Sequence, residues 1–128
     1  MPALRGLVTV LILVIVFVAG VAGGQQKYGT PKTVLHVVTV KWKAEATEEQ
    51  KKAATDGLKT MVGAVPGIKN VWLKTERLQP REYNYVFAIE FESRAAADAY
   101  GEHPAHDEWY KVYMPIREES RSYQMTNP

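Results

Sequence analysis

Two segments of the chain alternate apolar and polar positions with a period of two residues, which is the pattern of a half-buried β-strand. The first runs from Thr33 to Lys43, is rich in β-branched residues, and has further apolar residues at the start of its second face. The second runs from Tyr83 to Glu92 and has the clearest alternation in the chain. The residues that share one face are Val34, His36, Val38, Val40 and Trp42 in the first segment, and Tyr85, Phe87, Ile89 and Phe91 in the second.

A helix is predicted between these two strands. Thr47 and Gln50 have the spacing of a capping box, in which the first side chain accepts a backbone hydrogen bond and the second returns one. The segment Val65-Pro66-Gly67 ends the helix, because proline and glycine do not continue it. The apolar stripe of this helix consists of Ala54, Leu58, Met61, Val62 and Val65.

The rest of the pattern completes a known topology. Strands are predicted over Ile68–Thr75 and Ile116–Met125, and the segment around Pro80 is a turn. Short helices are predicted from Ser93 to Tyr100 and from Pro104 to Tyr113. The resulting order βαββαβ predicts an α+β, ferredoxin-like fold, with a four-stranded antiparallel sheet and its helices on one face.

Such a sheet leaves its second face bare, and the residues available for that face are apolar or aromatic. A large exposed apolar face is a binding surface. A second copy of the chain, packed sheet to sheet, is the simplest cover. We therefore expect a homodimer that forms an α+β barrel, with the candidate site residues gathered in the hollow between the two sheets.

The N-terminal segment has the order of a targeting sequence. Arg5 precedes the uncharged apolar run Leu7–Val18, and small residues follow, with Ala22 or Gly23 as the last residue before cleavage. The alternative is an uncleaved membrane anchor, since Leu7 to Gly24 has the minimal length of a bilayer span. Both alternatives export the domain. The expected organisation is a signal peptide or anchor at 1–24, a linker at 25–31 and one domain at 32–128.

Composition excludes several classes of function. The 128 residues are 46% hydrophobic, which suits one compact core, and 16 Lys+Arg against 14 Asp+Glu, with both signs mixed, do not suggest a nucleic-acid partner. The chain has no cysteine, so it forms no disulfide, thiolate nucleophile or Cys-ligated zinc site. Glycine-rich phosphate loops and nucleophile elbows are absent as well, and no cofactor is expected.

Candidate chemistry lies with the histidines. Histidine is the side chain most easily poised as an acid or base near neutral pH. His106 falls in the first turn of a predicted helix, where the helix end disfavours an imidazolium, and Tyr100 could polarise a carbonyl oxygen. Structural roles are the alternative: His103 as a helix cap, His36 as a buried, hydrogen-bonded ring, and Tyr100 as a core residue. A metal at His103 and His106 is not expected, because the intervening proline places His103 before the helix and zinc usually needs three ligands.

Four short segments resemble the stress-responsive A/B-barrel (Dabb) family, over Thr33 to about Met125. They are the opening strand with His36 and Trp42, the stop Val65-Pro66-Gly67-Ile68, the strand end Phe91-Glu92-Ser93, and Tyr100-x-x-His103-Pro104-x-His106. The last segment is the most specific. The resemblance implies a dimeric α+β barrel. In one plant member, which closes a linear polyketide by aldol condensation, the catalytic pair falls on His106 and Tyr100 here, and a pocket-lining histidine falls on His36.

The resemblance also implies a ligand pocket, but its wall differs from that of the plant member. Where that member has aromatic side chains, this chain has Ala54, Thr55 and Leu58. The residues expected to contact a ligand are Val38, Val40, Leu58, Phe87 and Trp109.

Two functions follow from these observations. One is an exported homodimer that binds a small apolar molecule in its barrel, and the other is a cofactor-independent lyase or cyclase. In the second, His106 is the general base, Tyr100 stabilises the enolate and His36 assists. Convergence of the three rings on an enclosed cavity would favour chemistry, whereas rings bonded to backbone groups would favour a structural role.

Overall fold

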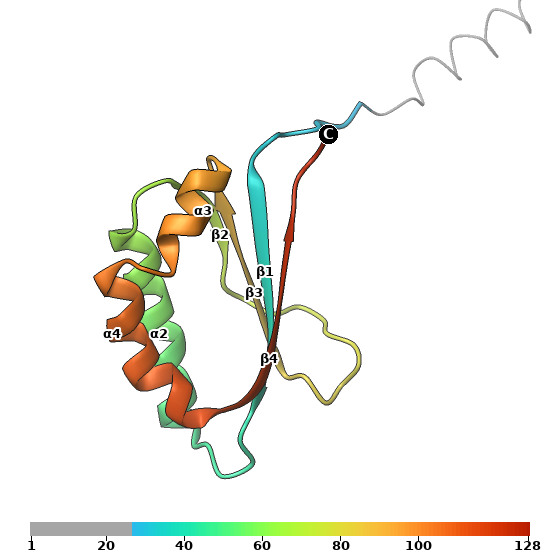
Figure 1. Ribbon diagram of the computed structural model, residues 1–128. Helices are drawn as coiled ribbons and strands as arrows, with labels where there is room; N and C mark the ends of the chain where they lie inside the picture. Colours follow the sequence, from blue (N-terminus) through green and yellow to red (C-terminus); the bar gives the residue numbers. More distant parts are fainter. Residues whose placement is uncertain (1–26) are drawn as a thin grey trace, which may run out of the picture. The chain divides into compact units, whose positions relative to one another are not determined.

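Four antiparallel strands form a single sheet in the order β2-β3-β1-β4. The computed structural model describes residues 27–128 (Figure 1). The strands are β1 (Val34–Trp42), β2 (Ile68–Trp72), β3 (Tyr85–Phe91) and β4 (Arg117–Met125). β1 pairs with β3 on one side and with β4 on the other, so β4 is an edge strand.

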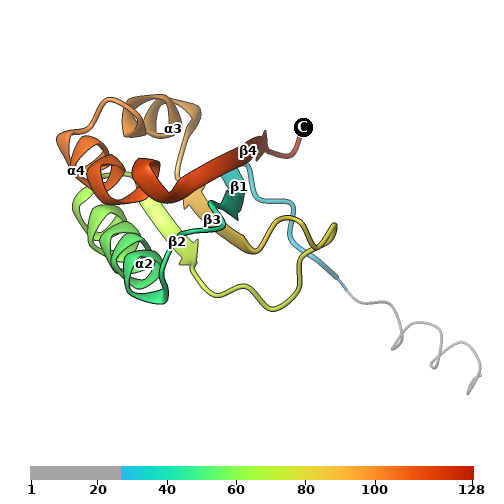
Figure 2. The same cartoon turned by 90° about the horizontal axis from the view of Figure 1, so that it is seen from below.

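Three helices cover one face of this sheet, as Figures 1 and 2 show. They are α2 (Glu48–Ala64), α3 (Arg94–Tyr100) and α4 (Pro104–Tyr113), and the 3₁₀ turn η1 (Met114–Ile116) joins α4 to β4. The βαββαβ, ferredoxin-like topology predicted from the sequence is therefore confirmed.

The segment predicted as a signal peptide or anchor at 1–24 lies outside the described residues, as do the first two residues of the predicted linker at 25–31. Within residues 27–128, no helix is both long and apolar enough to cross a membrane.

Local sequence signals set the ends of the helices. At the start of α2, the Thr47 Oγ1 accepts a hydrogen bond from the Gln50 backbone N–H (3.1 Å), and the Thr47 N–H donates to Gln50 Oε1 (2.9 Å), so the predicted capping box is present. At the start of α4, His103 Nδ1 accepts from the Ala105 N–H (3.1 Å), with proline at the first turn. His103 thus has the structural role of a cap.

The end of β2 differs from the prediction. β2 ends at Trp72 rather than Thr75, because the Thr75 hydroxyl takes both backbone groups of Val86: it accepts from the N–H (2.8 Å) and donates to the carbonyl (3.1 Å). A side chain thus replaces strand pairing there. Helix α4 ends at Tyr113 as predicted, and Pro115 lies in η1, at a position that needs no N–H donor.

The two faces of the sheet have different environments. The β1 row from Val34 to Trp42 alternates buried and half-buried residues, and its buried side chains pack under the helices. The opposite face bears large exposed side chains: Trp72 is 52% exposed, Tyr123 50% and Met125 53%. The core thus lies on one side of the sheet, and an apolar surface remains on the other.

Replacement of Gly67 by alanine should destabilise the fold. Gly67 has φ of +81°, which L side chains rarely adopt, and an added Cβ would lie 2.6 Å from the Ala96 Cβ. The left-handed conformation alone costs about 1–2 kcal/mol, and the contact with Ala96 adds to it. Gly63→Ala is the matched control, since a Cβ there meets nothing within 4 Å and should stabilise α2 by about 0.5–1 kcal/mol. Chemical denaturation of both variants measures the difference, and equal midpoints would contradict the strain at Gly67.

Candidate functional site

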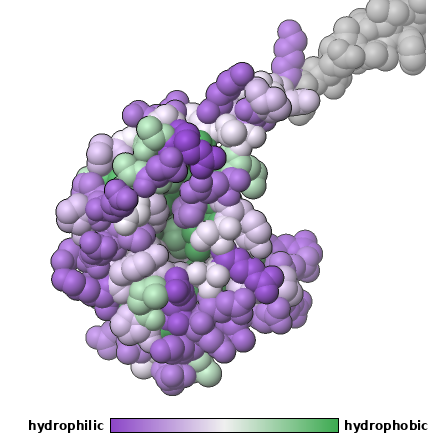
Figure 3. Space-filling view, in the orientation of Figure 1, coloured by the Kyte–Doolittle hydropathy of each residue, from purple (hydrophilic) through white to green (hydrophobic). Residues whose placement is uncertain are grey.

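A cavity of about 550 Å³ lies between the sheet and helices α3 and α4. Figure 3 shows it as a hollow with hydrophobic residues inside. One wall comes from the core strands and the aromatic side chains of the helices, and the other comes from polar residues of β4. The lining includes His36, Val38, Phe87, Tyr100, His106, Trp109, Tyr110 and Tyr113, together with Arg117, Ser120, Ser122 and Gln124.

The position of this cavity corrects one expectation. The candidate rings do not gather in a hollow between two sheets, because the cavity lies within one protomer, on the face that the helices cover. His36 shares that face with Val34 and Val38, so the helices bring Tyr100 and His106 to it. The period-two pattern showed which residues share a face but not which face the helices cover.

Three rings from three elements meet in the cavity. His36 comes from the middle of β1, Tyr100 is the last residue of α3, and His106 lies in the first turn of α4. The Tyr100 ring centroid is 5.7 Å from that of His36 and 4.8 Å from that of His106, nearly edge-on in the second case. The backbone between α3 and α4 holds the last two in place, since the His106 N–H donates to the His103 carbonyl (2.9 Å).

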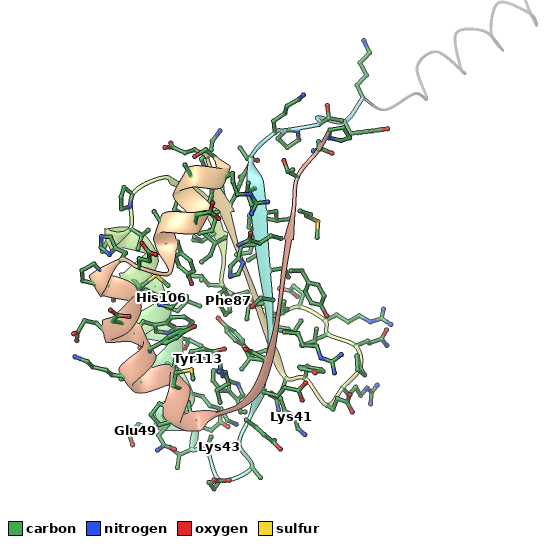
Figure 4. The ribbon with its side chains drawn as sticks, viewed as in Figure 1. Lys41, Lys43, Glu49, Phe87, His106 and Tyr113 are labelled. Atoms are coloured by element: carbon green, nitrogen blue, oxygen red, sulfur yellow. The ribbon has the colours of Figure 1, made fainter. Side chains whose placement is uncertain are left out.

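His106 is held as a neutral imidazole. Burial lowers its pKa, an effect that the neighbouring Asp107 carboxylate partly opposes. Within residues 27–128 the ring's Nδ1 is buried without a hydrogen-bond partner, which leaves Nε2 as the nitrogen that can reach a ligand. Figure 4 shows His106 on α4, with Phe87 across from it on the sheet. A neutral ring in this position can accept a proton.

The other two rings of the site are neutral as well. Burial lowers the pKa of His36, and the nearby His106 lowers it further. His36 Nδ1 lies 3.4 Å from Gln124 Nε2, a side-chain contact across β1 and β4. Burial raises the pKa of Tyr100, so its phenol keeps its proton and can donate a hydrogen bond. Neither histidine ring is bonded to a backbone group in the described part of the chain.

The residues expected to contact a ligand divide into two groups. Val38, Phe87 and Trp109 line the cavity, whereas Val40 and Leu58 lie in the core outside its lining. Helix α2 contributes no residue to the lining, so the small side chains at Ala54 and Thr55 do not shape this wall. The Trp109 indole N–H donates to the Ala54 carbonyl (2.9 Å), which fixes the ring between α2 and the cavity.

Several lining residues did not emerge from the sequence analysis. Tyr110 and Tyr113 follow His106 at spacings of four and seven, which places them on the same face of α4. Ser120, Ser122 and Gln124 alternate along β4, but the sequence does not single them out, because Arg121 between the two serines is polar as well. Within residues 27–128, no three His, Asp or Glu side chains are grouped as metal ligands.

The comparisons with known proteins agree with this architecture. The chain is 30% identical over 96 residues to olivetolic acid cyclase from Cannabis sativa, a match that covers 73% of this chain and 95% of the cyclase. A dimeric ferredoxin-like protein of unknown function from Thermobifida fusca has a TM-score of 0.66 at 18% identity, and the match covers 80% of this chain and 97% of that one. A hydroxynitrile lyase from Passiflora edulis has a TM-score of 0.64 at 18% identity, over 74% of this chain and 93% of the lyase.

At identities of 18% the two structural matches show a shared fold. The family resemblance seen in the sequence has stronger support, because the model of the Stress responsive A/B Barrel Domain matches residues 34–127, nearly the whole described domain. The chain belongs to the Stress responsive A/B Barrel Domain (Dabb) family.

Proposed function

We propose that this protein binds a small, largely apolar carbonyl compound in the cavity and acts on it as a cofactor-independent lyase or cyclase. The observation that carries the proposal is the convergence of His36, Tyr100 and His106 on one cavity, with a buried, neutral imidazole among them. A relative that is a cyclase and a structural neighbour that is a lyase support the reaction class.

The proposed step is a proton transfer at carbon. Nε2 of neutral His106 removes a proton from the carbon next to the carbonyl, and the electron pair of that C–H bond moves onto the carbonyl oxygen. The Tyr100 phenol donates a hydrogen bond to this enolate oxygen, and the adjacent His36 supports the pair. The enolate then attacks a second carbonyl or expels a leaving group, and the imidazolium returns its proton to the product.

The surroundings suit such a step. The rings of Phe87 and Trp109 meet edge to face at 5.9 Å, and the Trp109 and Tyr113 rings stack at 4.2 Å. These aromatic side chains form an apolar wall that can hold the hydrocarbon part of a ligand. A ligand that packs against them displaces water, which strengthens the hydrogen bond from Tyr100 to a developing negative charge.

Binding without turnover is the second candidate. It is favoured by the unpartnered Nδ1 of His106, because a catalytic histidine usually donates its second N–H to an orienting acceptor. In this case the cavity stores or carries the same kind of molecule. Both candidates place the protein outside the cytoplasm, which rests on the order of Arg5, the apolar run Leu7–Val18 and the small residues after it.

Proton–deuterium exchange tests the chemistry without the natural substrate. In D₂O with 4-phenyl-2-butanone as the probe, the protein should accelerate exchange of the protons next to the ketone, measured by NMR. His106→Gln should reduce this rate about 10²–10⁴-fold, the contribution typical of a general base, and Tyr100→Phe should reduce it by a smaller factor. His103→Asn is the control, since asparagine is also a good helix cap and the rate should stay unchanged. Full exchange activity in His106→Gln would leave only the binding function.

The buried histidines should make stability depend on pH. Because their pKa values are lowered below the ordinary 6.5, the folded state binds fewer protons than the unfolded state under mildly acidic conditions. The free energy of unfolding should therefore be fully present above about pH 6.5 and decrease as the pH falls toward about 5. Denaturant titrations across this range measure the slope, and replacing both His36 and His106 by glutamine should flatten it. An unchanged slope would show that the two rings are not buried as described.

We also expect a homodimer formed through the outer face of the sheet, where Trp72, Tyr123 and Met125 are exposed. The dimeric ferredoxin-like neighbour supports this assembly. Light scattering of the purified protein should give twice the mass of one chain, and Trp72→Lys should shift it toward the monomer. A lysine at Val112, exposed on the helix side, should leave the dimer intact. A wild-type monomer at micromolar concentration would contradict this assembly.

A further inference from the structure

The end of the cavity away from the histidines contains a cation without a matching anion. Arg117, the first residue of β4, lines the cavity and is half-buried. Its Nη1 donates to the Ser120 hydroxyl (3.1 Å), and its Cζ lies 5.4 Å from the centre of the Tyr113 ring. Among the ion pairs of residues 27–128, none involves Arg117. No carboxylate of the described residues therefore forms an ion pair with this half-buried guanidinium.

A second polar group, the Tyr113 hydroxyl, lies near Arg117 and has no hydrogen-bond partner. Tyr113 is 2% exposed, and its hydroxyl is one of two buried side-chain polar atoms in the described chain that lack a hydrogen-bond partner. Arg117 and Ser120 are near enough to influence this hydroxyl electrostatically, but neither meets it with hydrogen-bonding geometry. Stacking on Trp109 holds the Tyr113 ring in place. A buried hydroxyl without a partner costs free energy, and it keeps this end of the cavity polar beside Arg117.

The two ends of the cavity differ in charge. The lining contains one carboxylate, Asp98 of α3, and one guanidinium, Arg117. Figure 1 places α3 at one end of the helix layer and the start of β4 at the other, and Figure 4 places Tyr113 beyond His106 toward the Arg117 end. A negatively charged group is repelled by Asp98 and attracted by Arg117, so it would bind at the Arg117 end.

Both walls give a similar length for the space between the two ends. On α4, Tyr113 follows His106 by seven residues, a rise of about 10 Å at 1.5 Å per residue. On β4, Gln124, which contacts His36, is four residues beyond Ser120, a distance of about 13 Å. Val38, Phe87 and Trp109 line the space between, so the middle of the cavity is apolar.

We infer that the cavity binds an elongated carboxylate about 10–13 Å long, whose anionic end is held by Arg117 and whose apolar body reaches the histidines. The fork of the guanidinium matches the two oxygens of a carboxylate, and the single guanidinium of the lining suits one negative charge better than two. The inference rests on the proposed function in placing the reactive carbonyl of such a ligand at the His106 end. The anion subsite itself does not require turnover.

A matched pair of probes tests the subsite, namely 6-phenylhexanoate and its neutral analogue 6-phenylhexanamide. The purified wild-type protein should bind the acid at least about tenfold more tightly than the amide, since hydrogen bonds to charged groups are the stronger ones. Arg117→Gln should remove this preference, because it weakens the binding of the acid but not that of the amide. Arg117→Lys should keep part of the preference, because lysine retains the positive charge but lacks the forked guanidinium. Calorimetry measures all affinities.

Arg121→Gln is the control, because Arg121 lies on the same strand but pairs with Glu119 and stacks over Tyr83 rather than lining the cavity. It should leave both affinities unchanged. Equal binding of acid and amide by the wild type, or a preference that survives in Arg117→Gln, would overturn the subsite while the cavity remains a binding site. If neither probe binds, the subsite and the proposed ligand cavity both fail. If the acid preference persists but His106→Gln exchanges protons at the wild-type rate, only the proposed chemistry fails.

Discussion

The burial of a histidine in an otherwise apolar row of the central strand constrains the rest of the site. His36 lies between Val34 and Val38 on the face of β1 that the helices cover, and β1 is hydrogen-bonded on both sides. An imidazole in this environment is stable when it is neutral and when polar or aromatic groups surround it. Tyr100, His106 and Gln124 supply those groups from α3, α4 and β4. The cavity therefore lies where the helices pack over His36, the polar residue in the buried row of β1.

The same low-polarity surroundings act in opposite directions on the two kinds of ring. Burial lowers the pKa of His36 and His106, and it raises the pKa of Tyr100 and Tyr113. Imidazoles and phenols are consequently neutral together over a wide range of pH. A neutral imidazole accepts a proton and a neutral phenol donates a hydrogen bond, so desolvation alone provides an acceptor and a donor without a metal ligand or a third charged residue.

Local signals in the sequence predicted the fold, whereas the walls of the cavity depended on tertiary contacts. The capping box at Thr47, the cap at His103 and the alternation along β3 each depend on neighbours within a few residues, and each has its predicted structure. Leu58 was expected to contact a ligand, but its distance from the cavity depends on how α2 packs, which helical periodicity does not contain. The placement of His36 under the helices likewise required knowing which face they cover. The cavity-lining residues of β4 could not be singled out, because nearly all residues of this strand are polar and a polar edge strand is usually a solvated one.

Alternate residues of strand β4 face the cavity and the outer surface of the sheet. Ser120, Ser122 and Gln124 line the cavity, while the intervening Tyr123 and the following Met125 are exposed on the opposite face of the sheet. Since side chains along a strand alternate strictly, a shift of one residue would exchange the two sets. Arg121 and Tyr123 would then face the cavity, and serines would occupy the outer surface. Natural variation in this strand should therefore take the form of point changes, because the gain or loss of a single codon between η1 and Met125 would damage both surfaces at once.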